Sequence, residues 1–91
     1  MADLTSMKNI GREMARKLEA VGIDSPERLR EEGATAAFFR LKTLCPNVCL
    51  VHLYALEGAV RDVDFNALPP ETKADLKAFS DALNGKGGPA L

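Results

Sequence analysis

Residues 50–61 have the sequence LVHLYALEGAVR, the most apolar helical segment of the chain. Its apolar side chains fall on every side of a helix, which is typical of the buried centre of a helical bundle. Gly58 lies inside this stretch, where glycine costs about 1 kcal/mol relative to alanine. We therefore expect another helix to pass close to Gly58. Glu57 is predicted to be a buried, hydrogen-bonded carboxylate that fixes a loop or a helix end.

Three helical segments are predicted on the N-terminal side of this stretch. The first has apolar residues every three or four positions, which defines one helix face: Ile10, Met14, Leu18 and Val21. Gly22 is expected to cap its C-terminus. Ser25 can cap the start of a second, short helix that ends at Gly33. The third begins at Ala34 and ends before Pro46, because the residue before proline avoids the α conformation.

On the C-terminal side, residues 64–66 predict a loop, and LPPE at residues 68–71 predicts the start of a last helix. Alternating patterns typical of strands are almost absent. The sequence therefore predicts an all-α protein, a compact bundle of about five short helices. We expect residues 1–84 to form one domain and residues 85–91, GKGGPAL, to form a flexible tail.

Length and charge narrow the classes of function. A chain of 91 residues predicts one domain, and 12 Lys and Arg against 13 Asp and Glu give a net charge of −1. This balance argues against a strongly basic nucleic-acid binder. No apolar run approaches the roughly 20 residues of a membrane span, and the N-terminus lacks the pattern of a signal peptide. We expect a cytoplasmic protein without membrane contact.

Catalytic and metal-binding patterns are weak. Cys45, Cys49 and His52 offer three potential soft ligands, but a structural zinc site needs four. The structural interpretation is that Cys49 begins the central helix and Cys45 fills an apolar gap; a redox role for Cys49 is the alternative. The sequence has no recognisable nucleophile motif or phosphate-binding loop. We expect no enzyme activity, no cofactor, no metal and no small-molecule substrate.

Residues 4–23, LTSMKNIGREMARKLEAVGI, resemble a helix-hairpin-helix motif. In that motif, backbone N–H groups at a helix N-terminus can bind a DNA phosphate. Here Asn9 replaces the first glycine of the turn and Gly11 is the second. The basic residues Lys8, Arg12 and Arg16 would add positive charge. The alternative is a turn that only lets two helices pack, with Ile10 in the core.

Two neighbouring phenylalanines are expected to differ in exposure. Helical spacing places Phe38 on the core face and Phe39 about 100° away. An exposed Phe39 would indicate a surface for a protein partner or for self-association. The alternative is a partly covered side chain at the edge of the core.

Four segments resemble, in order and spacing, the C-terminal domain of TfoX (Sxy) proteins: NIGREMARKLEAVGI, SPERLREEGATAAFFRLK, LYALEGAV and LPPETKADL. The resemblance implies a small helical domain with a helix-hairpin-helix-like, SAM-like core and no catalytic residues. TfoX proteins are bacterial regulators of natural competence that also carry an N-terminal domain. The chain therefore looks like a stand-alone C-terminal domain.

Two functional hypotheses follow. The first is a non-enzymatic regulatory domain that acts by protein–protein contact in transcriptional regulation, through Phe39 and the exposed faces of the last two helices; self-association would use the same surfaces. The second is a weak DNA-binding module that contacts phosphate through the backbone of residues 9–12, with Lys8, Arg12 and Arg16 as ionic partners.

Overall fold

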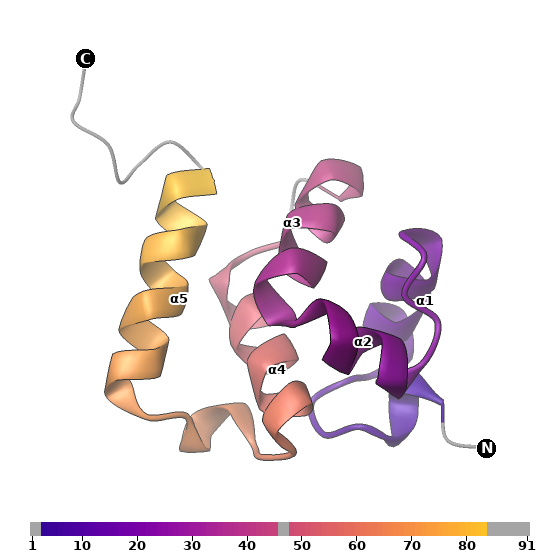
Figure 1. The fold of residues 1–91 in the computed structure, drawn as a ribbon, viewed down its shortest axis with the longest axis horizontal. Helices are drawn as coiled ribbons and strands as arrows, with labels where there is room; N and C mark the ends of the chain where they lie inside the picture. The colour runs from indigo at the N-terminus through magenta and orange to yellow at the C-terminus, as the bar shows by residue number, and fades with distance from the viewer. Residues whose placement is uncertain (1–2, 46–47, 84–91) are drawn as a thin grey trace.

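The computed structural model describes residues 3–45 and 48–83. Within these segments the chain forms five α-helices, two short 3-10 helices and no strand (Figure 1), which confirms the all-α prediction. The elements, in order, are η1 (Leu4–Ser6), α1 (Arg12–Ala20), α2 (Pro26–Glu32), α3 (Ala34–Leu44), α4 (Leu50–Arg61), η2 (Phe65–Ala67) and α5 (Pro70–Leu83). The predicted tail at residues 85–91 lies outside the described residues.

Local signals set the helix ends as expected. Ser25 caps α2, its Oγ accepting a hydrogen bond from the backbone N–H of Arg28 at 3.1 Å. Gly22 follows α1 with φ of +89°, and Gly33 separates α2 from α3 with φ of +86°. Both glycines take a conformation that side chains with a Cβ rarely adopt. Residues at the helix ends therefore determine where α1 ends, where α2 begins and ends, and where α3 begins.

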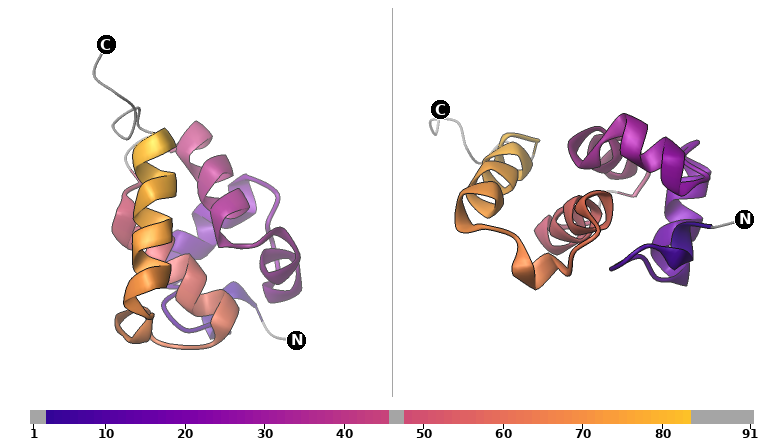
Figure 2. Two further views of the ribbon diagram at one scale, coloured as in Figure 1. Left: turned by 60° about the vertical axis from the view of Figure 1, so that its left-hand side comes forward. Right: turned by 60° about the horizontal axis from the view of Figure 1, so that its bottom comes forward.

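The central helix α4 packs against both α3 and α5, and α3 and α5 also contact each other; Figure 2 shows the three helices grouped together. The core around it consists of fully buried apolar side chains: Leu18, Ile23, Leu29, Phe38, Leu41, Leu53 and Leu56. The expectation that α4 is buried on every side is wrong in its first turn. Val51 is 54% exposed there, because it faces an open hollow between α1 and α4 rather than a packed helix.

The N-terminal segment does not confirm a helix-hairpin-helix core. Its first helical piece, η1, has three residues and is a single 3-10 turn. Ile10 is buried, as the packing interpretation of this turn requires. The described residues thus support the alternative interpretation, a turn whose buried Ile10 packs the start of α1 against the core.

The last helix, α5, stands at one side of the molecule (Figure 1) and contacts mainly α4. Leu76 and Ser80 are buried, while Phe79 is partly buried against the core. Tyr54 of α4 donates a hydrogen bond to the backbone carbonyl of Lys73 at 3.4 Å. Among the described helices, none has the length and apolar character needed to cross a membrane.

Candidate functional site

Asn9, at the predicted phosphate-binding turn, is bonded to distant parts of the chain. Its backbone has φ of +69°, a left-handed conformation that asparagine tolerates. Its Nδ2 donates to the carbonyls of Val63 at 3.0 Å and Ala55 at 3.5 Å, and its Oδ1 accepts the N–H of Phe65 at 3.3 Å. The Asn9 side chain therefore joins the N-terminal turn to α4 and η2.

Gly58 makes room for this side chain. A Cβ at Gly58 would lie 2.4 Å from Asn9 Nδ2 and 2.7 Å from the carbonyl oxygen of Val63. The expected close approach at Gly58 is present, but a side chain and loop backbone approach it rather than a helix. The amide of Asn9 is engaged within the protein, so the predicted phosphate contact would have to use the backbone of this turn.

The other residues of the predicted DNA site are exposed. Lys8, Gly11, Arg12 and Arg16 all lie at the surface. Gly11 is the N-cap of α1 and supplies no side-chain hydrogen bond to the start of the helix. Glu13 is exposed in the same first turn and places a carboxylate among the basic groups. The structure thus gathers the basic residues near an uncapped helix start, together with one negative charge.

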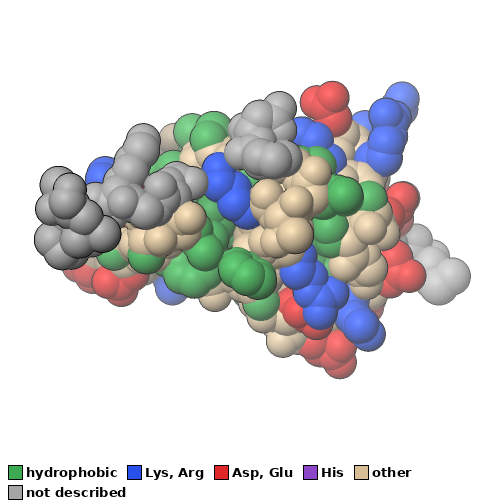
Figure 3. All heavy atoms as spheres, turned by 90° about the horizontal axis from the view of Figure 1, so that it is seen from above, with side chains coloured by type: hydrophobic (Ala, Val, Ile, Leu, Met, Phe, Trp, Pro, Cys, Tyr) green, Lys and Arg blue, Asp and Glu red, His purple; other side chains and the backbone are tan. Residues whose placement is uncertain are grey.

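Phe39 is exposed, as one interpretation of its spacing predicted, with 54% of its surface accessible; Phe38 is fully buried. Phe39 lies between two hollows. The larger, of about 380 Å³, is lined by Ala20, Val21, Phe39, Arg40, Thr43 and Leu44. The smaller, of about 210 Å³, is lined by Phe39, Lys42, Thr43 and Leu83. We call Phe39, Thr43, Leu44 and these two hollows the Phe39 face. Figure 3, which views the molecule from above relative to Figure 1, shows hydrophobic side chains exposed among charged ones.

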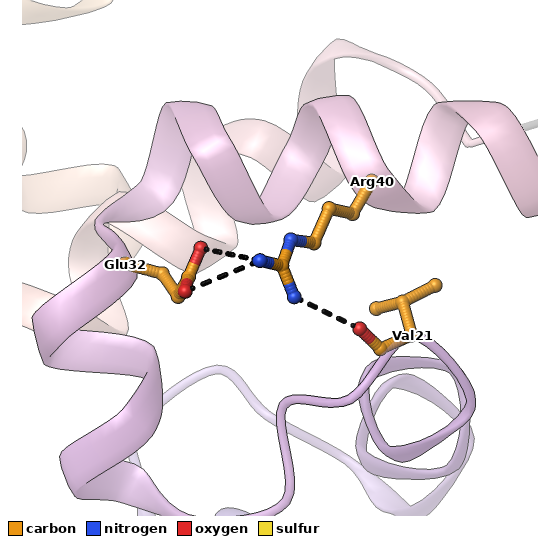
Figure 4. A network of polar contacts seen from close by, with 3 residues as sticks. All are labelled: Val21, Glu32 and Arg40. Carbon is orange, nitrogen blue, oxygen red and sulfur yellow. Dashed lines mark hydrogen bonds and ion pairs between the residues drawn. The ribbon is translucent and has the colours of Figure 1, made fainter.

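Arg40 fixes the helices beneath the Phe39 face. Its Nη1 donates to the carbonyl of Val21 at 3.1 Å, and its Nη2 lies 3.3 Å from both carboxylate oxygens of Glu32 (Figure 4). One guanidinium thus connects the ends of α1 and α2 to α3. This role could not be predicted from the sequence, because the contacts join Arg40 to residues 8 and 19 positions away.

Cys49 and His52 form the N-terminal cap of α4. The Cys49 sulfur accepts from the backbone N–H of His52, and His52 Nδ1 accepts the backbone N–H of Cys49 at 2.9 Å. This is the reciprocal geometry of a capping box, so the prediction that Cys49 begins the central helix is confirmed. The part of the chain that is described contains no group of His, Cys, Asp or Glu side chains able to bind a metal. The three-residue spacing could have revealed the cap.

Glu57 does not fix a loop. It is partly buried and forms an ion pair with Arg61, one turn further along α4. The carboxylate is hydrogen-bonded, as expected, but it is only partly buried, and its partner is Arg61 at the end of the same helix rather than a loop. Such a pair at i, i+4 is typical of a helix surface.

A third hollow, of about 300 Å³, lies between α1 and α4. Its lining residues are Asn9, Glu13, Met14, Lys17, Val51, His52, Ala55 and Phe65. Glu13 and Lys17 both belong to this lining, so its charged residues have opposite signs. This hollow presents no single charge preference to a ligand.

The fold and these surfaces define a small all-α domain with an exposed apolar face. Residues 1–80 match the family model of the TfoX C-terminal domain, and the chain belongs to that family. This confirms the resemblance carried by the four sequence segments.

Two solved structures share the fold of this chain. A crystal structure of an uncharacterized protein from Listeria monocytogenes, in a triclinic form, has a TM-score of 0.94 and 35% identity, covering 97% of this chain and 100% of that one. A tetragonal form of a protein of unknown function from Listeria monocytogenes has a TM-score of 0.86 and 36% identity, covering 88% of this chain and 99% of that one. No curated protein matches the chain.

Proposed function

We propose that this domain is a non-enzymatic protein-interaction module that acts in transcriptional regulation through the Phe39 face. The observation that carries the proposal is the exposure of Phe39 and Leu44, each 54% accessible on one helix, beside two hollows. An exposed apolar patch flanked by hollows is typical of a protein-binding site. The regulatory setting is proposed from membership of the TfoX C-terminal domain family.

Photo-crosslinking tests this proposal. A photoreactive amino acid is placed at position 39 in cells of the source organism, and the same amino acid is placed at position 51 in a control variant. Val51 is a matched control because it has the same exposed fraction, 54%, but lies on α4 beside a different hollow. We expect covalent adducts to another protein from position 39 in clear excess over position 51. Equal yields, or none, would contradict the proposal.

A second candidate function is weak DNA binding by the N-terminal turn. The observation that favours it is the uncapped start of α1, with three exposed basic residues nearby: Lys8, Arg12 and Arg16. Free N–H groups and the helix dipole attract phosphate. We rank this function second for two reasons. Glu13 adds a negative charge at the start of the helix, and the Asn9 side chain is already hydrogen-bonded within the protein.

Titration with duplex DNA tests the second candidate. Binding through phosphate must weaken steeply as salt rises. Exchanging Lys8, Arg12 and Arg16 for Glu should abolish it, while Phe39→Asp should leave it unchanged. Binding that is insensitive to these three exchanges would exclude the turn as the DNA site.

A further inference from the structure

We propose that the hollow between α1 and α4 binds a free α-amino acid with an apolar side chain. Its lining shares no residue with the two hollows beside Phe39, so this site is independent of the proposed function. The proposal follows from the size of the hollow, from two opposite charges in its lining and from an apolar lining that includes Val51.

The volume of the hollow selects a small molecule. Sites for small-molecule ligands usually have volumes of about 300–1,000 Å³. This hollow, at about 300 Å³, lies at the small end of that range. A nucleotide or a helix of a partner protein would exceed it, whereas a single free amino acid fits.

Glu13 and Lys17 give the hollow two opposite charges. They lie one turn apart on α1, a spacing at which glutamate and lysine commonly form an ion pair. The ion pairs of the structure do not include this one, and neither side chain has a hydrogen-bond partner within residues 3–45 and 48–83. Both charges are therefore available to a ligand.

A ligand with a single charge would meet one attraction and one repulsion in this hollow. A carboxylate attracted to Lys17 would lie near the carboxylate of Glu13, and an amine attracted to Glu13 would lie near the ammonium of Lys17. A zwitterion satisfies both groups at once. A free α-amino acid carries its ammonium and its carboxylate on one carbon atom, whereas a residue inside a protein chain has neither charge. The lining therefore favours a free amino acid over a protein segment.

His52 supplies a further donor for the carboxylate of the ligand. Its Nδ1 accepts the backbone N–H of Cys49 at 2.9 Å, so the proton of the neutral ring is on Nε2. No acceptor among the described residues is bonded to Nε2. His52 lines the hollow from the first turn of α4 and Lys17 lines it from α1. The ligand carboxylate would accept hydrogen bonds from both helices.

The apolar part of the lining selects an apolar side chain. Met14 and Ala55 are buried, and Phe65 is partly buried. Val51 is 54% exposed, although most large apolar side chains of the described residues are buried. A leucine side chain that covers Val51 and Phe65 would remove apolar surface from water, which stabilises the complex.

Titration of the labelled protein with four small molecules, followed by amide shifts, tests the proposal. L-Leucine is the expected ligand. Isocaproate is leucine without its ammonium, isoamylamine is leucine without its carboxylate, and glycine lacks the apolar side chain. We expect leucine to shift the amides of residues 13–17 and 51–55. Each of the other three should bind at least about fivefold more weakly, as the loss of one partly exposed contact predicts.

Charge variants on α1 assign the contacts. Glu13→Gln should weaken binding of leucine but not of isocaproate, because it removes the attraction for an ammonium and the repulsion of a carboxylate together. Lys17→Gln should weaken binding of both leucine and isocaproate. Glu19→Gln and Arg16→Gln are matched controls, because they remove exposed charges of the same helix outside the hollow. We expect both controls to bind leucine as the wild type does.

Three outcomes would overturn the amino-acid site. The first is that millimolar leucine shifts no amide, or only amides away from this hollow. The second is that isocaproate or isoamylamine binds as tightly as leucine, because one charge would then suffice. The third is that Glu13→Gln and Glu19→Gln have equal effects on leucine binding. Crosslinking from position 39 is unaffected by these results, so the proposed function stands or fails separately.

Discussion

The side-chain amide of Asn9 occupies the space that a Cβ on Gly58 would need, at 2.4 Å from that position. The same amide spans from the N-terminal turn to the carbonyl of Val63, 54 residues away. The two residues therefore constrain each other: one must carry a compact donor and acceptor, and the other must carry no side chain.

Gly58→Ala should destabilise the domain although alanine favours a helix interior. The gain in helix propensity is about 1 kcal/mol, whereas overpacking against Asn9 and the Val63 carbonyl is expected to cost about 2–3 kcal/mol. We expect a net loss of stability in urea unfolding. The Asn9→Gly, Gly58→Ala double variant should lose less than the sum of the single variants, because Asn9→Gly removes one of the two clashes. Strict additivity would show that the two positions do not interact.

Asn9→Asp should destabilise the domain through lost hydrogen bonds rather than backbone strain. Aspartate tolerates the same left-handed conformation, but its carboxylate would face the carbonyls of Val63 and Ala55 without a donor. We expect a loss of about 2 kcal/mol, the usual cost of an unsatisfied polar group, measured by chemical denaturation. Asn9→Gly keeps the conformation and serves as the control that removes the side chain. A stability of Asn9→Asp equal to that of the wild type would refute the bonding pattern.

Arg40→Lys should loosen the junction of α1, α2 and α3. A lysine presents one ammonium and cannot reach the Val21 carbonyl and the Glu32 carboxylate with separate nitrogens. The Arg40 side chain is 41% exposed, so the ion pair is screened and we expect a loss of only about 1 kcal/mol. Hydrogen exchange at the end of α1 should become faster. Unchanged exchange there, with intact helix content, would contradict the role given to Arg40.

His52 should be found in the tautomer that carries its proton on Nε2. Its Nδ1 accepts the backbone N–H of Cys49, so that nitrogen cannot carry a proton in the neutral ring. Long-range nitrogen–proton NMR correlations on labelled protein at a pH where the ring is neutral identify the tautomer. Predominance of the Nδ1–H form would show that the cap does not form in solution. Cys49→Ser should retain the tautomer, since the backbone N–H is unchanged.

The sequence predicted those parts of the fold that depend on neighbouring residues. Gly22, Ser25 and Gly33 act within one turn of their own helices, so their residue types alone indicate where helices begin and end. The contacts of Asn9 and Arg40 depend on which distant carbonyl or carboxylate comes within reach, and only the packed chain determines that. Val51 shows the same limit, because its apolar character cannot reveal which neighbouring helix fails to cover it.

The position of Arg40 links binding to folding. Phe39 directly precedes Arg40 in the chain. A partner on the Phe39 face would therefore contact the region where Arg40 joins α3 to the ends of α1 and α2. Such a partner binds the folded domain and not the unfolded chain, and at a hundred times its dissociation constant it adds about 2.7 kcal/mol to the free energy of unfolding. For a marginally stable chain of this size, occupancy would slow proteolysis, so the cellular lifetime of the domain would report on the abundance of its partner.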